Sequence, residues 1–281
     1  LIGKQLKLGV NLSGSSRKTN NKDNLIDNII RFRPDFPAYN EDGSLNLVTT
    51  STVIENPHLT LANRNDGRGL TFSSSAFLEW TILDGLKFKS TGTVNYTNSK
   101  TDVFSKKGTR GYSIAYNTRS LGNSEYNTYV WDNTLTWMKD FGKHNLVAVV
   151  GQSIEKYKSN YLSGGADDFP DEEVLINLGS GADSWSDSDE AGNTLVSAIA
   201  RINYKYNNRY LATFTFRTDG SSKFGPDKRW GYFPSGALAW VISEEEFMAP
   251  LKTYIPYLKL RASIGKIGSQ NLGNYDYISL M

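Results

Sequence analysis

The sequence predicts an all-β fold, specifically a segment of an antiparallel transmembrane β-barrel with short periplasmic turns and long extracellular loops. Strand-like segments of about ten residues are joined alternately by tight turns and by long polar connections, as in membrane-spanning barrels. Within these segments apolar and polar residues alternate with a period of two, which is typical of strands. Several connections are longer than about 15 residues, and such loops are uncommon in compact soluble domains.

Nine strands are expected along the chain. Tight turns at Asp84-Gly85, at residues 140–143 and at Asn207-Asn208 join three pairs of them into hairpins, because Asp, Asn and Gly adopt the backbone conformations that such turns need. A tenth strand is expected to begin near Tyr275. The predicted strands cover residues 5–14, 70–83, 86–98, 126–139, 144–157, 194–206, 209–219, 232–243 and 257–268.

The alternation assigns a lipid-facing and a water-facing side to each strand. A Lys or Arg on the lipid side near the bilayer midplane costs about 2–4 kcal/mol, so charges in the middle of a strand should lie opposite the apolar residues. In the strand 194–206, Ile202 and Tyr204 have the opposite parity to Arg201. Asn133 and Gln152 are exceptions, because they fall on the predicted lipid side. The predicted lipid-facing set includes Leu8, Val10, Phe72, Trp80, Trp131, Leu135, Phe214, Leu238 and Leu260.

A soluble β-sheet with one dry and one wet face gives the same alternation. A soluble or surface-displayed glycan-binding β-sandwich is therefore the alternative function, with the aromatic face buried between two sheets. Tyr and Trp near strand ends, such as Tyr126, Trp137 and Tyr206, favour the membrane barrel, because these side chains gather at bilayer interfaces.

The longest predicted connection, residues 15–68, contains an expected helix at residues 23–33. Leu25, Ile26, Ile29 and Ile30 form an apolar stripe at helical spacing. The helix is expected to end before Pro34, because proline disfavours helical backbone in the preceding residue. We expect the stripe to pack the connection onto the barrel rim or onto a partner.

A second long connection is expected at residues 159–193, which are rich in Gly, Ser and acidic residues. Asp183, Asp187, Asp189 and Glu190 surround Trp185 in this connection. Carboxylate oxygens at such spacing are compatible with calcium, but the pattern of a complete calcium loop is absent. Solvated acids are the preferred interpretation, and no metal site is predicted.

Composition argues against several classes of function. The net charge is +2, which favours neither nucleic acid nor an anionic partner. Cysteine is absent, and His58 and His144 are the only histidines, so thiolate zinc sites and cysteine nucleophiles are excluded. The sequence contains no nucleophile elbow, phosphate-binding loop or dinucleotide motif. A hydrolase on a β scaffold thus has no support, and neither an enzyme activity nor a cofactor is predicted.

Four motifs in the last third of the chain are more specific. They comprise residues 201–211 (RINYKYNNRYL), 216–225 (FRTDGSSKFG), 229–235 (RWGYFPS, followed by Ala239-Trp240), and 258–265 (LKLRASIG) with 268–271 (GSQN). In this order they closely resemble the SusC/RagA family of TonB-dependent transporters. The resemblance extends more loosely over the rest of the chain, including Pro34-Asp35-Phe36-Pro37 after the expected helix.

The resemblance implies an outer-membrane transporter of Bacteroidetes-type Gram-negative cells, with a barrel of about 22 strands closed by an amino-terminal plug. Such a transporter imports oligosaccharides or peptides, works with a SusD-like surface lipoprotein and draws energy from the TonB–ExbB–ExbD complex. Residues 1–281 are expected to be part of the barrel, since neither the plug nor the TonB box is found in them. The barrel is expected to close with strands outside this chain, because unpaired strand edges are costly in lipid.

The candidate substrate-binding residues are polar side chains of the lumen face together with one loop aromatic: Arg201, Asn203, Arg217, Asp219 and Trp185. Lys205, Lys259 and Arg261 share the lumen face. The lumen charges either contact a passing solute or pair with one another and with the plug, and pairing is the favoured interpretation. Trp185 either stacks on a sugar ring or anchors its loop.

Overall fold

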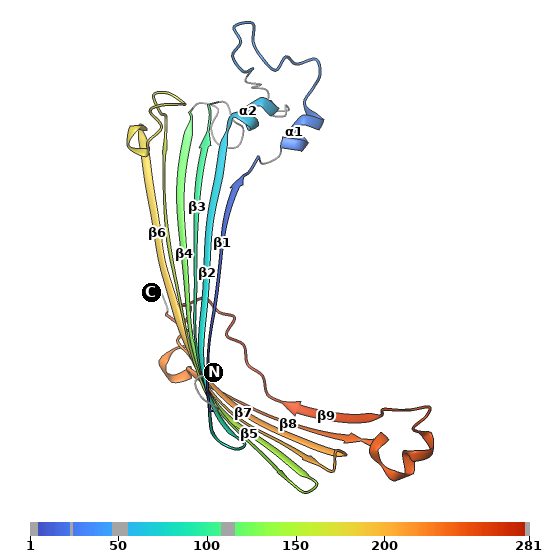
Figure 1. Cartoon of the computed structure of the whole chain (residues 1–281). Helices are drawn as coiled ribbons and strands as arrows, with labels where there is room; N and C mark the ends of the chain where they lie inside the picture. Colours follow the sequence, from blue (N-terminus) through green and yellow to red (C-terminus); the bar gives the residue numbers. More distant parts are fainter. Residues whose placement is uncertain (1–4, 23–24, 47–55, 108–115, 279–281) are drawn as a thin grey trace.

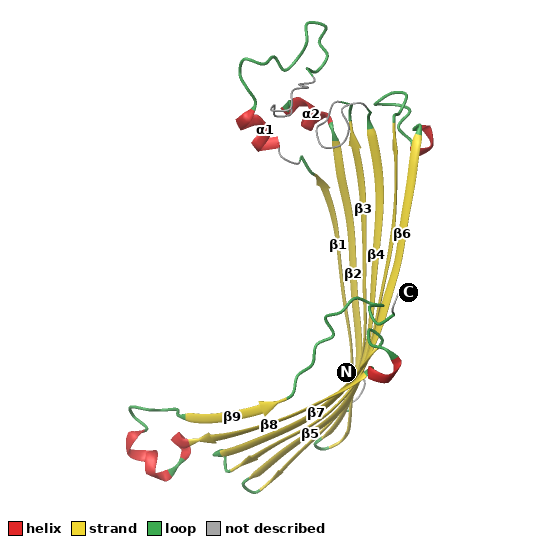
Figure 2. Cartoon of the chain, turned by 180° about the vertical axis from the view of Figure 1, so that it is seen from behind, coloured by secondary structure: helices red, strands yellow, loops and turns green. Residues whose placement is uncertain are grey.

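The described residues fold into one antiparallel sheet of nine strands, in the order β1 to β9 along the sequence (Figure 1). The computed structural model describes residues 5–22, 25–46, 56–107 and 116–278. Figures 1 and 2 show a single curved layer, with no second sheet packed against it. The strands are β1 (Leu6–Asn20), β2 (Arg64–Leu83), β3 (Leu86–Ser105), β4 (Thr118–Phe141), β5 (His144–Asp167), β6 (Asp183–Tyr206), β7 (Tyr210–Ser221), β8 (Trp230–Val241) and β9 (Lys259–Gly265).

The three predicted tight turns are confirmed. Gly85, with φ of 79°, and Asn207 and Asn208, with φ of 49° and 56°, adopt the left-handed backbone that these turns need. At Gly85 a side chain is also excluded by space, because a Cβ atom there would collide with the backbone carbonyl oxygen of Met138 on β4. The turn residues therefore fix both the hairpins and the approach of neighbouring strands.

The register brings the predicted lipid-facing residues of all nine strands onto one side of the sheet, which we call the outer face. Residues directly opposite each other on neighbouring strands share a face, and such pairs connect Leu8 with Leu78, Ile202 with Phe214, and Trp240 with Leu260. Asn133 and Gln152, the two polar exceptions, lie opposite each other on β4 and β5. The opposite side, which carries Arg201 and Lys259, is called the lumen face.

The outer face is exposed along the sheet. Phe214 is 54% exposed and Leu260 is 62% exposed, whereas a β-sandwich requires both side chains to lie between two layers. In the described part of the chain, buried apolar side chains are few: Leu59, Phe104, Ala166, Phe169, Val241 and Met248. The β-sandwich alternative is therefore wrong, and the apolar outer face is that of a transmembrane β-barrel segment.

Most strands reach farther toward the loop side than predicted, and two predicted loops are largely strand. β9 is the exception, because it ends at Gly265 and not at the predicted residue 268. β3 continues to Ser105, and residues 159–167 and 183–193 pair with each other as the ends of β5 and β6. A 24-residue strand such as β5 reaches about 80 Å at roughly 3.3 Å per residue, whereas about 9–11 residues cross a bilayer. Beyond the apolar band, apolar residues no longer recur at every second position, so the alternation disappears although the hydrogen-bonded ladder continues.

The described residues of the connection between β1 and β2 form two short helices. α1 (Leu25–Arg31) is shorter than the predicted helix 23–33, whose first two residues lie outside the described residues. α2 (Pro57–Ala62) was not predicted, although Asn56 caps it and Pro57 occupies its first turn. No helix among the described residues is long and apolar enough to span a membrane.

The expected tenth strand is wrong within the described residues, where residues 275–278 form a turn instead. Among the described residues, β1 pairs only with β2, and β9 pairs only with β8. Both edges of the described sheet are therefore open. Because open edges cost several kcal/mol per unpaired backbone group in lipid, a membrane-embedded sheet of this kind requires neighbouring strands.

The connection between β8 and β9 is tied to the turn side of the sheet by Glu245. Its carboxylate accepts hydrogen bonds from the Tyr210 hydroxyl (2.7 Å), the Trp240 indole (2.9 Å) and the Arg209 guanidinium (2.9 Å). The bond from Tyr210, then that from Trp240 and the nearby charge of Arg209, lower the pKa of Glu245 below its ordinary value of 4.5. These contacts stabilise the charged form of the carboxylate at neutral pH.

Ile202→Lys is expected to destabilise the intact barrel in a bilayer by about 2–4 kcal/mol, because it places a charge on the outer face within the membrane span. Val147→Lys is the matched control, since Val147 lies opposite Asn203 on the lumen face. Unfolding in lipid vesicles measures both effects. Equal losses of stability in the two variants would contradict the assignment of faces.

Glu245→Gln is expected to destabilise the intact protein at neutral pH but not in acid. Because the folded-state pKa of Glu245 is lowered, its stabilising contribution is complete above its ordinary value of 4.5 and disappears as pH falls through the lower folded-state value. Thermal unfolding of the wild-type protein and the variant between pH 3 and pH 7 tests this. A difference in unfolding temperature that stays constant over this range would show that the charge of Glu245 contributes nothing.

Candidate solute-binding surface on the lumen face

The lumen face brings four of the five candidate residues onto β6 and β7. Arg201 and Asn203 are on β6, and Arg217 and Asp219 are on β7. Arg201 lies opposite Thr215, and Asn203 lies opposite Thr213, so these four residues follow one another along a single hairpin. Their common face follows from parity, because every second residue of a strand points to the same side.

Arg217 and Asp219 form an ion pair on this hairpin. Arg217 Nε lies 2.8 Å from one carboxylate oxygen of Asp219 and 2.9 Å from the other, and Nη2 donates to the Ser197 hydroxyl at 3.0 Å. The side chains remain 44% and 20% exposed, so the pair contributes at most about 1 kcal/mol to stability. Its main effect is to hold the guanidinium in place with part of its donor surface free.

Arg201 and Asn203 bind their neighbours on β7. Arg201 Nε donates to the Thr215 hydroxyl at 3.1 Å, and the Asn203 side-chain oxygen accepts from the Thr213 hydroxyl at 3.0 Å. The sequence favours pairing of the lumen charges with their neighbours. Arg201 and Arg217 do bond to neighbouring side chains in this way. These hydrogen bonds orient the side chains across the strands without burying them.

A hollow of about 400 Å³ opens beside Arg217 and Asp219. It is enclosed by Leu195 of β6, the loop-side ends of β7 and β8, the connection between β7 and β8, and residues 268–270 after β9. Three of the predicted family motifs therefore meet at one place. The lining residues are Leu195, Arg217, Asp219, Ser221, Phe224, Lys228, Arg229, Trp230, Gly231, Phe233, Gly268, Ser269 and Gln270.

Two glycines of these motifs allow the wall of the hollow to close around Phe233. A Cβ atom at Gly231 or at Gly268 would collide with the Phe233 ring. The ring therefore lies against both backbones, one from β8 and one from the segment after β9. This close approach needs glycine at both positions, and it explains the glycines of the Arg-Trp-Gly and Gly-Ser-Gln motifs as packing requirements.

The chemistry of the hollow suits a polar solute with negative charge. Arg217, Lys228 and Arg229 supply three positive charges, and Asp219 supplies one negative charge. The side-chain oxygen of Gln270 is buried and has no hydrogen-bond partner within the described part of the chain. An unpaired buried acceptor is costly, so a bound donor group at this position would be stabilised. The hollow thus offers cationic groups, an amide oxygen and aromatic rings.

Trp185 is not part of this group of residues. It lies in β6 rather than in a loop, because the ladder between β5 and β6 continues to Asp183. Trp185 is on the lumen face, at the opposite end of β6 from Arg201, and its indole covers Gly165 of β5. The expectation of a loop aromatic was wrong because alternation is lost in the polar ends of the strands.

The acidic residues around Trp185 are spread along β6. Asp187 and Asp189 share the lumen face, whereas Glu190 points to the outer face. Among the residues that the structure describes, no three histidine, aspartate or glutamate side chains converge to form a metal site. The structure therefore gives no support to a calcium ion at residues 183–190.

Several functional features were not predicted from the sequence. The hollow depends on residues 268–270 folding back beside β8, and the sequence carries no signal for this return. The pairing of Arg217 with Asp219 was accessible, because residues two apart on a strand share a face. Gly231 and Gly268 were visible as motif residues, but their contact with the same ring was not.

No family model matches the chain, but curated proteins match it. It is 32% identical over 286 residues to TonB-dependent receptor P3 of Formosa agariphila, covering 99% of this chain and 28% of the relative. It is 52% identical over 89 residues to TonB-dependent receptor SusC of Bacteroides thetaiotaomicron, covering 31% of this chain and 9% of SusC. The chain thus spans about a quarter of the length of receptor P3.

Solved structures match the fold of the whole chain. The RagAB peptide transporter superposes with a TM-score of 0.80 at 20% identity, covering 100% of this chain and 33% of the matched chain. The RagAB peptide importer in its open-open state gives a TM-score of 0.82 at 21% identity. The fold is therefore that of the matched part of the RagAB transporter. Together with the sequence matches, it identifies the chain as a barrel segment of a SusC/RagA-type TonB-dependent receptor.

Proposed function

We propose that this chain forms part of the wall of a transporter that imports polar nutrients, either oligosaccharides or peptides, across the outer membrane of a Bacteroidetes-type Gram-negative cell. The observation that carries the proposal is the division of one continuous sheet into an apolar outer face and a charged lumen face. Such a wall separates lipid from an aqueous passage. The relatives named as TonB-dependent receptors support this function.

The proposed passage is lined by side chains that can exchange contacts with a solute. Arg201, Asn203, Arg217 and Asp219 offer hydrogen-bonding groups along the β6–β7 hairpin, and Trp185 offers an aromatic surface nearer the extracellular end. The three cations of the hollow beside Arg217 favour solutes that carry a carboxylate, as peptides and acidic sugars do. We expect residues 1–281 to close into a barrel with further strands, and a plug to connect that barrel to the TonB–ExbB–ExbD complex.

A SusD-like surface lipoprotein is the proposed partner on the loop side, and α1 provides a surface for it. Ile26, Ile29 and Ile30 are 74%, 56% and 77% exposed. Asn28 points the other way, where it is buried and donates to the Thr60 hydroxyl of α2 at 3.1 Å. Within the described residues no part of the barrel rim covers the apolar stripe, and this exposure supports a partner as the surface that contacts it.

Arg217→Ala in the intact transporter is expected to reduce uptake at least tenfold, while thermal stability changes by less than about 1 kcal/mol, because the exposed ion pair contributes little to folding. Uptake of labelled oligosaccharides and of labelled peptides is measured in cells that contain only the variant receptor. Arg261→Ala is the matched control, since Arg261 faces the lumen on β9 outside the hollow. Full uptake by the Arg217 variant would exclude solute contact there.

Ile26→Asp combined with Ile30→Asp is expected to abolish capture of the surface lipoprotein by the intact receptor. Charges in the centre of an apolar contact lose the burial energy and add an unpaired desolvated group. Co-purification of the two proteins from membranes measures the interaction. Val174→Asp is the matched control, because Val174 is equally exposed, at 76%, in the connection between β5 and β6. Unchanged capture by the double variant would place the lipoprotein elsewhere.

A further inference from the structure

Three basic residues form a row across the outer face. Lys18 of β1 lies opposite Arg68 of β2, and Arg68 lies opposite Lys100 of β3. All three side chains are exposed. Like charges directly opposite each other on neighbouring strands destabilise a sheet. No ion pair to any of the three is found in the described part of the chain, so a bound anion would relieve their repulsion.

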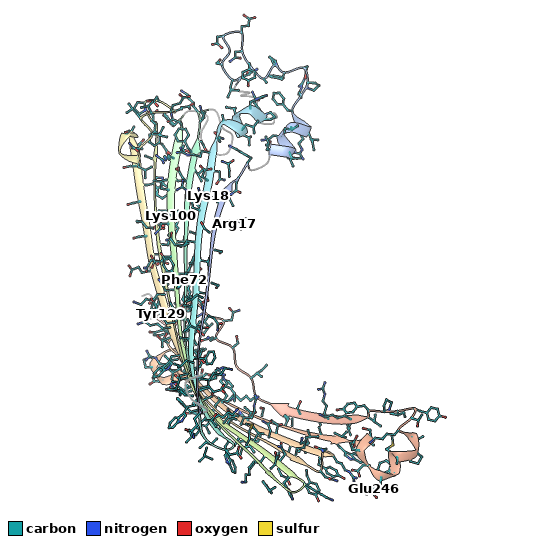
Figure 3. The ribbon with its side chains drawn as sticks, viewed as in Figure 1. Arg17, Lys18, Phe72, Lys100, Tyr129 and Glu246 are labelled. Atoms are coloured by element: carbon teal, nitrogen blue, oxygen red, sulfur yellow. The ribbon has the colours of Figure 1, made fainter. Side chains whose placement is uncertain are left out.

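The row lies just beyond the apolar band of the outer face. Leu70 and Phe72 follow Arg68 on the same face of β2, at two and four residues toward the turn end, and Tyr96 of β3 lies opposite Phe72. Four residues of strand correspond to about 13 Å. Figure 3 labels Lys18 and Lys100 farther along the sheet toward the loop end than Phe72 and Tyr129. Aromatic residues mark the level of the lipid headgroups, so the basic row stands at or just above that level.

A hollow of about 640 Å³ adjoins this row on the same face. Arg68 and Lys100 line it together with Leu121 and Leu162, and Leu178 belongs to its lining as well. Leu178 comes from the connection between β5 and β6, which folds over the outer side of the strand ends and packs against Phe104, Ala166 and Phe169. Asp66 and Asp102 also line the hollow. It therefore combines charged and apolar walls, as an amphipathic headgroup requires.

Nearby carboxylates do not neutralise the row. Asp102 is held by Arg119 at 2.9 Å and by Arg64 at 3.2 Å. Asp66 accepts a hydrogen bond from Asn20 at 2.7 Å. Glu125 lies opposite Asn98, two residues nearer the membrane than Lys100, and accepts from Asn127 at 2.8 Å. Together the area holds five cationic side chains and three carboxylates, so it keeps an excess of positive charge.

We propose that Lys18, Arg68 and Lys100 bind the phosphate groups of an anionic glycolipid headgroup in the outer leaflet of the membrane, with the adjoining hollow taking up part of that headgroup. Lys and Arg pair strongly with phosphate oxygens. The position of the row at the headgroup level selects a membrane lipid over a soluble ligand. The proposal rests on the proposed function only in that both place the outer face of the sheet in an outer membrane.

The test uses the purified intact receptor and measures lipid binding by native mass spectrometry. The probe is diphosphorylated lipid A, compared with the same lipid after removal of its phosphates. A variant carrying Lys18→Gln, Arg68→Gln and Lys100→Gln is expected to bind diphosphorylated lipid A about 100-fold more weakly, at about 1 kcal/mol for each charge lost. The conservative variant with Lys18→Arg and Lys100→Arg is expected to keep wild-type binding.

The matched control is a lumen variant with Lys205→Gln, Lys259→Gln and Arg261→Gln. Like the outer variant, it loses two lysines and one arginine, but from the opposite face of the sheet. It is expected to bind the lipid as the wild-type receptor does.

Equal binding of the phosphorylated and dephosphorylated lipids would overturn the proposal, as would equal weakening by the outer and lumen variants. Full competition by millimolar inorganic phosphate would assign the row to a free anion instead. If the outer triple variant does not fold, Lys100→Gln alone is compared with Lys205→Gln. Because binding is measured without transport, failed uptake leaves this result intact.

Discussion

The structure depends on one constraint, the pairing of every backbone N–H and C=O group within a continuous antiparallel ladder. In hydrocarbon no water can replace a missing partner, so strands must pair on both sides across the bilayer. The ladder also fixes the register, and a shift by one residue would exchange the two faces of a strand. Leu8, Phe214 and Leu260 share the outer face for this reason, and Arg201 and Lys259 share the lumen face.

Close approach between backbone and aromatic rings shapes the lumen side. Gly231 and Gly268 leave room for Phe233, so the segment after β9 can lie beside β8. This contact brings Gln270 near Arg217 and creates a cationic hollow on a wall that otherwise carries side chains bonded to their neighbours. If this wall contacts solutes as proposed, their selection would depend on residues 268–270 and on the β7–β8 connection as much as on the strand residues.

The parts of the fold that cross lipid could be predicted from the sequence, because the bilayer imposes a strict alternation there. Ile202 and Arg201 have opposite environments, and that contrast is visible in any strand that spans the membrane. Beyond the apolar band the contrast ends. Ser120, Gly122 and Ser124 of β4 are small or polar residues on a strand that continues far above the membrane, and residues 159–193 read as a loop for the same reason.

The candidate site was predictable only in part, for a similar reason. Parity placed Arg217 and Asp219 on one face, and their ion pair follows from that spacing. Parity gives no information on residues 268–270 or on the packing of Leu178 over the outer face, because these depend on chain reversals with no periodic signal. Trp185 was assigned to a loop because Asp183 to Glu190 offer no apolar partners that would indicate a strand.

β6 extends farther toward the loop side than its neighbour β7, and this difference shapes the edge of the sheet on that side. β6 pairs with β7 only from Leu195 onward, so its first residues, Asp183 to Asn193, have a strand neighbour on one side alone. These residues lie above the bilayer, where water can satisfy the free backbone groups. The strand part of the wall is therefore lower at β7, β8 and β9 than at β6. Connecting residues replace strands beside this part of β6, as in the hydrogen bond from Asn193 to Asn274 at 2.8 Å.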